Sequence, residues 1–224
     1  GDPVDHSLSP RMHNAAFRAL GLDYVYVPFR PTVRTIADAV GAIRSLGLVG
    51  VNVTVPFKGD VMPHLDRVSD TARAAGAVNT IVNRSGKLFG ENSDVPGFSA
   101  AMAAAGFRLR GKRVLVAGAG GAARAVVHAL LEGGAGEIVI AHRTRARAAE
   151  LAKAFAESKA RLRIAGLDIL ADAAFLATRQ LIVNSTSVGL HGGEFLDYAA
   201  RATPKGCVHF DLAYREGLTP FLKL

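Results

Sequence analysis

The sequence predicts an α/β protein of two domains, and three features of the chain indicate this. Residues 113–212 alternate short apolar stretches with helical patterns, which is typical of a parallel doubly wound sheet. A glycine-rich turn at 118–121 joins one such stretch to a helical pattern, as in Rossmann-type domains. The first quarter carries two turns rich in small polar side chains. We expect an N-terminal α/β substrate domain over residues 1–94, a Rossmann-type dinucleotide-binding domain over 95–224, and a cleft between them.

Each predicted element of the N-terminal domain follows from a local pattern. Apolar residues at helical spacing predict helices, and apolar or β-branched runs predict strands. Gly47 ends one helix, and Arg84–Gly86 is the expected turn of a hairpin. In chain order the elements are a helix over Met12–Leu20, a strand over Tyr24–Phe29, a helix over Thr32–Leu46, a strand over Val49–Val55, and hairpin strands over Ala77–Asn83 and Lys87–Glu91.

The C-terminal domain is predicted from the alternation of strand and helix. An alanine-rich helix is expected to join the two domains, because a different pattern begins just after it. The elements are a helix over Val95–Ala105, a strand over Arg113–Ala117, a helix that ends near Glu132, a strand over Glu137–Ala141, a helix over Thr144–Ser158, and strands over Arg161–Leu167, Gln180–Asn184 and Gly206–Leu212.

The composition narrows the class of protein. No apolar run approaches the roughly 20 residues that span a bilayer, and no signal peptide is visible. Cys207 is the single cysteine, which excludes an internal disulfide, and we expect a core cysteine in a cytoplasmic protein. The formal net charge is +8, but aromatic residues do not interleave with the basic ones, so we expect no nucleic-acid partner. We also expect no membrane partner, no metal, and a monomer or homodimer.

The glycine-rich turn is the predicted site of a dinucleotide pyrophosphate. Glycines let the backbone approach the phosphates, whose charge is met by the N–H groups at the start of the following helix. Ala123 stands where a third glycine usually allows close helix packing. A tight turn without a ligand is the alternative, but the flanking strand and helix favour the nucleotide. The turn residues expected to hold it are Gly118, Ala119, Gly120, Gly121 and Ala122.

The end of the second strand of this domain distinguishes two cofactors. NAD-binding domains place an acidic residue there, which binds the ribose 2′-hydroxyl. This chain has His142, Arg143 and Thr144, and Arg147 follows one helical turn later. Two guanidinium groups can clamp a 2′-phosphate, whereas cations at an empty helix start oppose the helix dipole. The sequence therefore favours NADP over NAD.

The two polar turns predict a site for a small, polyhydroxylated anion. The first turn spans residues 1–10, and the second spans 50–58 and ends in Lys58, which places an amine at the edge of the site. A polar site in one half and a dinucleotide turn in the other suggest a dehydrogenase.

Together these motifs resemble the shikimate dehydrogenase family, which includes shikimate/quinate variants. The resemblance runs in order along essentially the whole chain. It is carried by Gly1-x-Pro3-x-x-His6-Ser7-Leu8-Ser9-Pro10-x-x-His13-Asn14, Asn52-Val53-Thr54-x-Pro56-Phe57-Lys58, Gly76-Ala77-Val78-Asn79-Thr80, Asn92-Ser93-Asp94-x-x-Gly97, the Gly118 turn, His142-Arg143-Thr144, Asn184-Ser185-Thr186-Ser187-x-Gly189, and Asp211-x-x-Tyr214 with Thr219-Pro220.

The resemblance implies a role for each matched position. Ser7 and Ser9 would bind the substrate carboxylate, and Tyr214 would close over the substrate. The ring hydroxyls would be held by Thr54, Asn79 and Asp94. Lys58 would be the catalytic acid/base, with Asp94 as its partner. NADP would be held by Gly118–Ala122 and His142–Arg147, and the residues placed near the cofactor or the cleft by position alone would be Asp70, Thr186 and Leu212.

General chemistry supports these roles, although each residue also has a plainer explanation. A lysine can accept the proton of an alcohol as it is oxidised, and in reverse its ammonium stabilises the forming alkoxide. Out of context, Lys58 could be a solvated lysine, Asp94 a helix cap, and Asn79 the cap of a hairpin end. Ser7 and Ser9 could be ordinary turn residues. These explanations do not account for the ordered set of motifs.

The family implies that this chain reduces 3-dehydroshikimate to shikimate with NADPH, in aromatic amino-acid biosynthesis. A quinate or aminoshikimate dehydrogenase, a non-catalytic NADP-binding regulator of the same fold, and a nucleic-acid-binding protein are the alternatives. The chain departs from the family pattern at Ser93 and His142. Family members also carry a strand before the position of Gly1 and a C-terminal helix that returns to the first domain. The sequence does not include these two segments, and disorder, omission and truncation are the alternatives.

Overall fold

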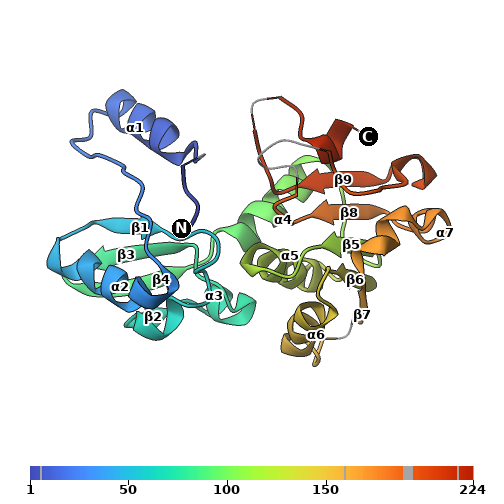
Figure 1. Cartoon of the computed structure of the whole chain (residues 1–224), viewed down its shortest axis with the longest axis horizontal. Helices are drawn as coiled ribbons and strands as arrows, with labels where there is room; N and C mark the ends of the chain where they lie inside the picture. Colours follow the sequence, from blue (N-terminus) through green and yellow to red (C-terminus); the bar gives the residue numbers. More distant parts are fainter. Residues whose placement is uncertain (6, 159, 189–193, 216, 224) are drawn as a thin grey trace. The chain divides into compact units, whose positions relative to one another are not determined.

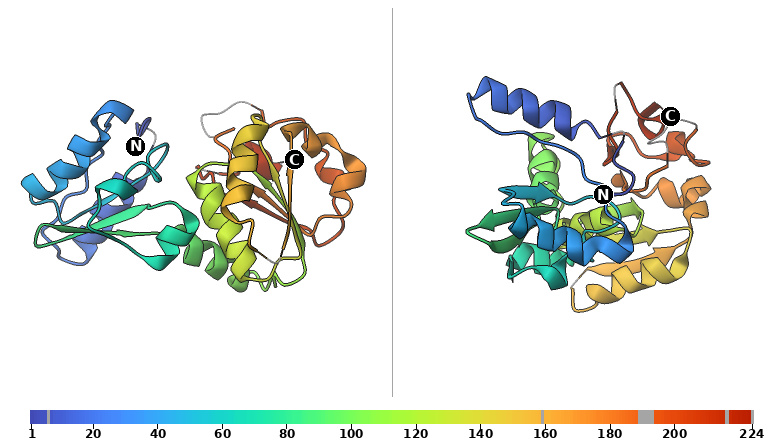
Figure 2. Two further views of the ribbon diagram at one scale, coloured as in Figure 1. Left: turned by 90° about the horizontal axis from the view of Figure 1, so that it is seen from below. Right: turned by 60° about the vertical axis from the view of Figure 1, so that its left-hand side comes forward.

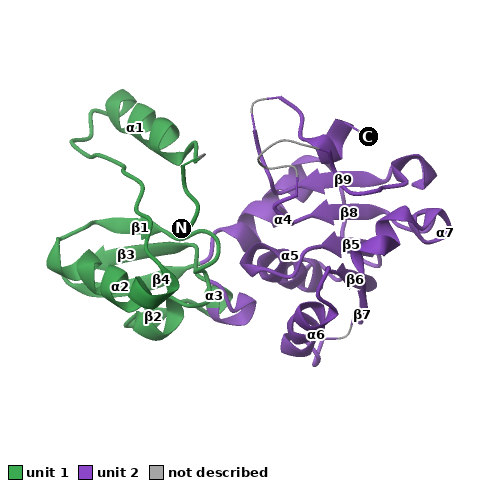
Figure 3. Ribbon diagram, in the orientation of Figure 1, with its two compact units in different colours: residues 1–72, 78–91 green, residues 73–77, 92–224 purple. Residues whose placement is uncertain are grey.

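The computed structural model describes residues 1–5, 7–158, 160–188, 194–215 and 217–223. The chain divides into two compact units, shown in Figures 1 and 3. Unit 1 comprises residues 1–72 and 78–91, and unit 2 comprises 73–77 and 92–224. The domain limits expected from the sequence, 1–94 and 95–224, stay a prediction, and the units differ from them in placing residues 73–77 and 92–94 with the second part.

Unit 1 is built on a four-stranded mixed sheet. Its strand order is β1-β3-β4-β2, in which β2 and β4 are parallel and the other pairs are antiparallel. The strands are β1 (Gly50–Asn52), β2 (Arg67–Val68), β3 (Thr80–Arg84) and β4 (Lys87–Glu91), and the helices of this part of the chain are α1 (Ser9–Ala19), α2 (Ile36–Ser45) and α3 (Asp70–Ala75), with 3₁₀ turns at Val33–Thr35 and Met62–His64. The predicted hairpin is confirmed by the pairing of β3 with β4. Val40 and Ile43 of α2 pack on the sheet, because they share one helical face and are almost fully buried.

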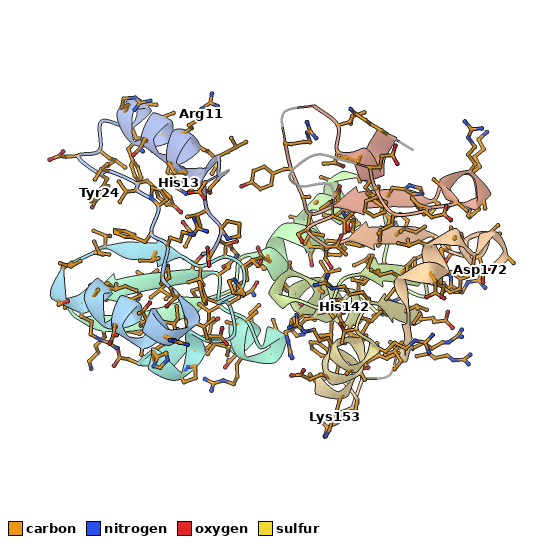
Figure 4. All side chains as sticks on the ribbon, viewed as in Figure 1. Arg11, His13, Tyr24, His142, Lys153 and Asp172 are labelled. Carbon is orange, nitrogen blue, oxygen red and sulfur yellow. The ribbon has the colours of Figure 1, made fainter. Side chains whose placement is uncertain are left out.

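The strand predicted over Tyr24–Phe29 is wrong. The segment is extended, but it forms no strand and pairs with none in the described part of the chain. The backbone of Tyr26 bonds to the Asn14 carboxamide instead. Tyr26 N donates to Asn14 Oδ1 at 2.7 Å, and Asn14 Nδ2 donates to Tyr26 O at 2.9 Å. His13, labelled in Figure 4, stacks on the Tyr26 ring at 4.4 Å between centroids. An apolar run therefore does not form a strand when a helix side chain takes the place of a neighbouring backbone.

Unit 2 contains a parallel sheet of five strands in the order β7-β6-β5-β8-β9, the doubly wound order expected of a Rossmann-type domain. The predicted fold class is confirmed. The strands are β5 (Arg113–Ala117), β6 (Glu137–Ala141), β7 (Arg161–Ala165), β8 (Leu181–Asn184) and β9 (Val208–Asp211), and the helices are α4 (Asp94–Ala104), α5 (Gly121–Glu132), α6 (Arg145–Ala154) and α7 (Ala173–Leu176), with 3₁₀ turns at Leu167–Ala171, Ala200–Ala202 and Pro220–Lys223. Several predicted elements are a few residues longer than the observed ones.

Both faces of this sheet are covered, as Figure 2 shows. Alternate residues of each strand enter different cores, so that Val114 and Val116 pack with α4, α5 and α6. Leu115 packs on the opposite face with α7 and with Phe221. Cys207 belongs to this second core, and burial raises the pKa of its thiol to about 11, which fits the predicted core cysteine. Every residue of β8 is buried, because a central parallel strand has no face toward water.

An ion pair of low exposure lies at the amino-terminal ends of the strands. Arg179 Nη1 donates to Glu137 Oε1 at 2.5 Å, and the guanidinium also stacks on Phe175 at 4.3 Å from the ring centroid. Burial acts to raise the pKa of Glu137, but the hydrogen bond and charge of Arg179, with the charges of Arg163 and Arg161, outweigh it and lower the pKa. A carboxyl whose pKa is lowered by folding stabilises the fold above its unfolded pKa and loses that contribution as pH falls.

We expect Glu137→Gln to reduce the free energy of unfolding by about 1.5 kcal/mol at pH 7, since the ion pair with Arg179 becomes a hydrogen bond from the guanidinium to a neutral carboxamide. The difference from the wild type should shrink as pH falls below the ordinary range of a glutamate pKa, because the wild-type carboxyl is then protonated as well. Urea unfolding between pH 3 and 7 measures it. The control is Glu132→Gln, which removes an exposed partner of His128 and should change stability much less. A difference that persists unchanged at pH 3 would contradict the assignment.

Candidate active site

The two polar turns of the first quarter lie side by side in unit 1. Asp2 N donates to Val55 O at 2.9 Å, which joins the start of the first turn to the second. A Cβ on Gly1 would overlap the Thr54 methyl group and would lie 3.1 Å from Val55 O, so this close approach requires glycine. The sequence-predicted proximity of the two motifs therefore has a geometric basis.

Ser7 and Ser9, the expected carboxylate ligands, form one local turn at the start of α1. Ser7 Oγ accepts from Ser9 N at 3.3 Å, and Ser7 N donates to Val4 O at 3.0 Å. Ser9 is the first residue of α1, and its carbonyl oxygen lies 2.9 Å from His13 Nδ1. The serines thus sit together at a helix N-terminus, where the positive end of the helix dipole favours an anion. Their role in binding a carboxylate stays a prediction.

Backbone hydrogen bonds bring Thr54, Lys58 and Asn79 to one end of the unit 1 sheet. Val53 N donates to Asn79 O at 2.8 Å, and Val78 N donates to Lys58 O at 2.7 Å. The turn that carries Lys58 is therefore tied to the strand entry that carries Asn79. Thr54 is exposed, Lys58 is half-buried and Asn79 is 9% exposed, so the exposure to solvent decreases from Thr54 to Asn79.

A chain of polar side chains links this end of the sheet to the extended segment. Tyr26 Oη donates to Asn52 Oδ1 at 3.1 Å, Asn52 Nδ2 donates to Thr80 Oγ1 at 3.4 Å, and Thr80 Oγ1 donates to Asn79 Oδ1 at 3.0 Å. The sequence predictions assigned no role to Asn52, Thr80 or Tyr26, although the first two stand within the quoted motifs. Their hydrogen bonds orient the Asn79 carboxamide. Asn52 and Thr80 could have been identified from the sequence as polar residues of the same motifs as the predicted ligands.

Asp94 belongs to unit 2 and begins α4, whereas Lys58 belongs to unit 1. The alternative that Asp94 serves as the cap of this helix is not supported, because Asn92 Oδ1 accepts from the backbone N–H groups of Asp94 and Val95 at 2.9 and 3.1 Å. Asn92 is 4% exposed, and its Nδ2 donates to Ala77 O at 2.8 Å. The pairing of Lys58 with Asp94 stays a prediction.

The predicted pyrophosphate turn lies at the carboxyl end of the unit 2 sheet. Gly118 has φ +122°, and a Cβ there would overlap Ser185 Oγ and lie 3.0 Å from the Ser185 backbone, so only glycine fits. Ser185 Oγ donates to Ala117 O at 2.7 Å, which fixes the turn against the loop after β8. Gly120 is the extended N-cap of α5, and Ala123 is fully buried. Ser185 was quoted in a motif but was given no role.

The four basic and polar candidates for the 2′-phosphate follow β6, next to that turn in the sheet. Gly118 N donates to Ala141 O at 2.8 Å, and Ala141 is the last residue of β6. Thr144 N donates to His142 Nδ1 at 2.9 Å, so the His142 ring holds the bend that leads into α6 (His142 is labelled in Figure 4). Arg143 and Arg147 are exposed, and the first turn of α6 contains no acidic residue. The described residues therefore offer cations and backbone donors where a 2′-phosphate is expected.

Thr186, Leu212 and Tyr214 also follow strand ends of this sheet. Leu212 N donates to Asn184 O at 2.9 Å, and Leu212 packs against the core beneath α5. Tyr214 is 62% exposed. Asp70, predicted near the cofactor, is an exposed residue of unit 1, whereas the other cofactor candidates belong to unit 2. The place of Asp70 near the cofactor stays a prediction.

Two further findings concern the described residues only. They contain no group of three His, Cys, Asp or Glu side chains placed to hold a metal ion. None of their helices combines the length and the apolar character needed to cross a membrane.

Comparison with known proteins is consistent with this geometry. Residues 1–81 match the family model of the shikimate dehydrogenase substrate binding domain, and residues 100–213 match that of shikimate / quinate 5-dehydrogenase. A shikimate dehydrogenase (NADP(+)) of Citrifermentans bemidjiense is 44% identical over 99% of this chain and 78% of its own length.

Two solved structures are similar throughout. Shikimate 5-dehydrogenase of Thermus thermophilus, in complex with NADP(H) and shikimate, is 39% identical with a TM-score of 0.83, over 100% of this chain and 80% of that one. Ligand-free 5-ketofructose reductase of a Gluconobacter species is 30% identical with a TM-score of 0.83, over 99% and 80% of the two chains. The two matched family models and the identity along the whole chain lead to one conclusion: the chain belongs to the shikimate dehydrogenase family.

Proposed function

We propose that the protein catalyses the reversible, NADPH-dependent reduction of 3-dehydroshikimate to shikimate, the step that the family performs in aromatic amino-acid biosynthesis. As a member of this family it is an NADP-dependent oxidoreductase. The observation that carries the proposal is the grouping of Thr54, Lys58 and Asn79 at one end of the unit 1 sheet, where a threonine, an amine and a carboxamide suit a hydroxylated ring. The Thermus thermophilus enzyme of the same fold was solved with NADP(H) and shikimate.

The residues of unit 1 are proposed to bind and orient the substrate. Ser7 and Ser9 bind the carboxylate at the N-terminus of α1. Thr54 and Asn79 hold ring hydroxyls, with the Asn79 carboxamide oriented by Thr80. Lys58 donates a proton to the oxygen of the carbonyl that becomes the alcohol, and its positive charge stabilises the alkoxide as it forms. In the direction of oxidation the amine accepts that proton.

The residues of unit 2 are proposed to bind the cofactor, and they fit its chemistry. NADPH supplies the hydride when it is bound. Gly118 leaves room for the backbone to approach a pyrophosphate, and the N–H groups at the start of α5 face the region after β5 where phosphates bind in such sheets. Arg143 and Arg147 bind the 2′-phosphate through charge-assisted hydrogen bonds. Asp94 binds a ring hydroxyl and orients Lys58, and Tyr214 closes over the substrate.

A second candidate function differs only in the substrate. The family model that matches residues 100–213 is named for shikimate and quinate, and a relative of the same fold reduces 5-ketofructose by its name. All of these substrates carry several hydroxyl groups, but shikimate and quinate are carbocyclic carboxylates, whereas 5-ketofructose is a neutral sugar. Ser7 and Ser9 at a helix N-terminus favour a substrate with a carboxylate over a neutral ketose.

A spectrophotometric assay of the protein with shikimate and quinate, each with NADP and NAD, tests the proposal. We expect shikimate with NADP to give the highest kcat/KM, at least about tenfold above quinate, because a polar group of the site that loses its hydroxyl partner costs about 1–3 kcal/mol. Absorbance at the nicotinamide band gives the rates from which kcat/KM is obtained. The third substrate in the assay is 5-ketofructose, tested with NADPH. A higher kcat/KM for quinate or the ketose would replace the proposed substrate, and no turnover with any of them would contradict the dehydrogenase function.

A further inference from the structure

We propose that Asp211, with Asn184 and Thr219, is a positioning device that holds two loops in one arrangement at the carboxyl end of the unit 2 sheet. One loop follows β8 and carries Thr186; the other follows β9 and carries Ala213. The inference rests on the proposed function, because these loops lie at the edge of the sheet where the cofactor is expected. The sequence predictions gave none of the three residues a role.

The device begins with a pair of side chains, a buried Asn184 and a half-buried Asp211, at the ends of two neighbouring strands. Asn184 and Asp211 are the last residues of β8 and β9 and face each other in register. Asn184 Nδ2 donates to Asp211 Oδ1 at 2.9 Å. The carboxylate only accepts hydrogen bonds, so it determines which way the Asn184 carboxamide turns. Asn184 Oδ1 therefore points toward the loop after β8.

The Asn184 carboxamide oxygen holds that loop. It accepts from Thr186 N at 3.0 Å and from Thr186 Oγ1 at 2.7 Å. Thr186 Oγ1 in turn accepts from Val188 N at 3.2 Å. Asn184 is fully buried, so a lost partner cannot be replaced by bulk water. The orientation of Thr186 thus depends on the last side chain of β8 and, through it, on Asp211.

The Asp211 carboxylate holds the second loop and a third segment. Its Oδ1 also accepts from Ala213 N at 3.0 Å, and its Oδ2 accepts from Thr219 Oγ1 at 2.5 Å. Thr219 is 5% exposed and lies just before the 3₁₀ turn at Pro220–Lys223. Three donors therefore converge on the two carboxylate oxygens. An ionised carboxylate has enough lone pairs to accept all three hydrogen bonds at once.

Hydrogen exchange of the whole chain without cofactor tests the coupling. The readouts are peptides covering residues 181–188 and 209–215. Asp211→Ala should raise exchange in both peptides about tenfold, since it removes the acceptor that orients Asn184. Asp211→Asn should stay within about threefold of the wild type, because its Oδ1 still accepts from Asn184 and Ala213 and its amide can donate to Thr219.

Thr219→Val is the second variant and keeps the test decisive if Asp211→Ala fails to fold. It removes one hydroxyl at nearly constant volume, and we expect faster exchange in both peptides. The matched control is Thr203→Val, whose hydroxyl donates to Ala200 O at 2.7 Å before β9, and which should leave both peptides unchanged. Unaltered exchange over 181–188 in Thr219→Val and in any folded Asp211→Ala overturns the coupling, as does an equal response to Thr203→Val.

Steady-state kinetics of the same variants separates positioning from general loss of stability. In Thr219→Val we expect kcat with 3-dehydroshikimate and NADPH to fall about tenfold while KM for NADPH changes less than about twofold, because misplaced loops affect the reacting geometry more than overall affinity. Thr219→Ser should restore kcat, since it restores the donor. An unchanged kcat overturns the catalytic part of the inference. A wild-type protein without activity would contradict the proposed function. The hydrogen-exchange data would still test the coupling of the two loops through Asp211.

Discussion

Replacement of Lys58 by alanine is expected to reduce kcat about 1,000-fold, within the range that general acid–base catalysis contributes. The variant loses both the proton donor and the positive charge that stabilises the alkoxide. The Kd for NADPH should change little, because Lys58 belongs to unit 1 and the predicted phosphate ligands belong to unit 2. Stopped-flow or steady-state absorbance gives kcat, and nicotinamide fluorescence gives the Kd.

Lys87→Ala is the matched control for this prediction. Lys87 is an exposed lysine at the start of β4, so its removal changes the net charge equally without touching the predicted site. It should retain wild-type kcat. If Lys58→Ala keeps more than about one tenth of wild-type kcat, the acid/base role is excluded, since that loss is below what such catalysis supplies.

The double variant Arg143→Ala with Arg147→Ala is expected to weaken NADP binding about 50-fold. Two charge-assisted hydrogen bonds to a 2′-phosphate are lost, and because both side chains are exposed each is worth about 1 kcal/mol or slightly more. NAD lacks this phosphate, so its Kd should change less than about threefold. Titration calorimetry with both nucleotides at several salt concentrations measures the difference, which should decrease as salt increases.

The control for the arginines is Arg201→Ala with Lys205→Ala. Both residues are exposed and lie before β9, so the change of charge is the same while the region after β6 is intact. The control should leave both affinities nearly unchanged. Equal weakening of NADP and NAD by the arginine variant would show that the guanidinium groups do not read the 2′-phosphate.

The parts of the fold that could be predicted from the sequence are those that depend on neighbouring residues. The turn from β5 into α5 is one example, because Gly118 must have a positive φ and only a short glycine-rich run permits it. The β3–β4 hairpin is another, since Ser85 and Gly86 both adopt positive φ between two apolar runs. The alternation of strand and helix predicted the parallel sheet for the same local reason.

One failure concerns a contact between residues that are distant in the sequence. Tyr24–Phe29 has the composition of a strand, but a strand requires a partner backbone, and here Asn14 bonds to Tyr26 instead. The place of Asp70 near the cofactor stays a prediction, because it too depends on residues far apart in the sequence.

The sequence by itself determined the family, the doubly wound sheet and the chemical identity of the candidate groups, because motifs and periodicity are properties of neighbouring residues. Only the tertiary structure decided which groups orient one another. Thr80 orients Asn79, and Asp211 turns Asn184 toward Thr186, through hydrogen bonds made by strand register and burial. A side chain's direction in a buried network depends on donors and acceptors that arrive from distant segments, and no local pattern of the chain specifies them.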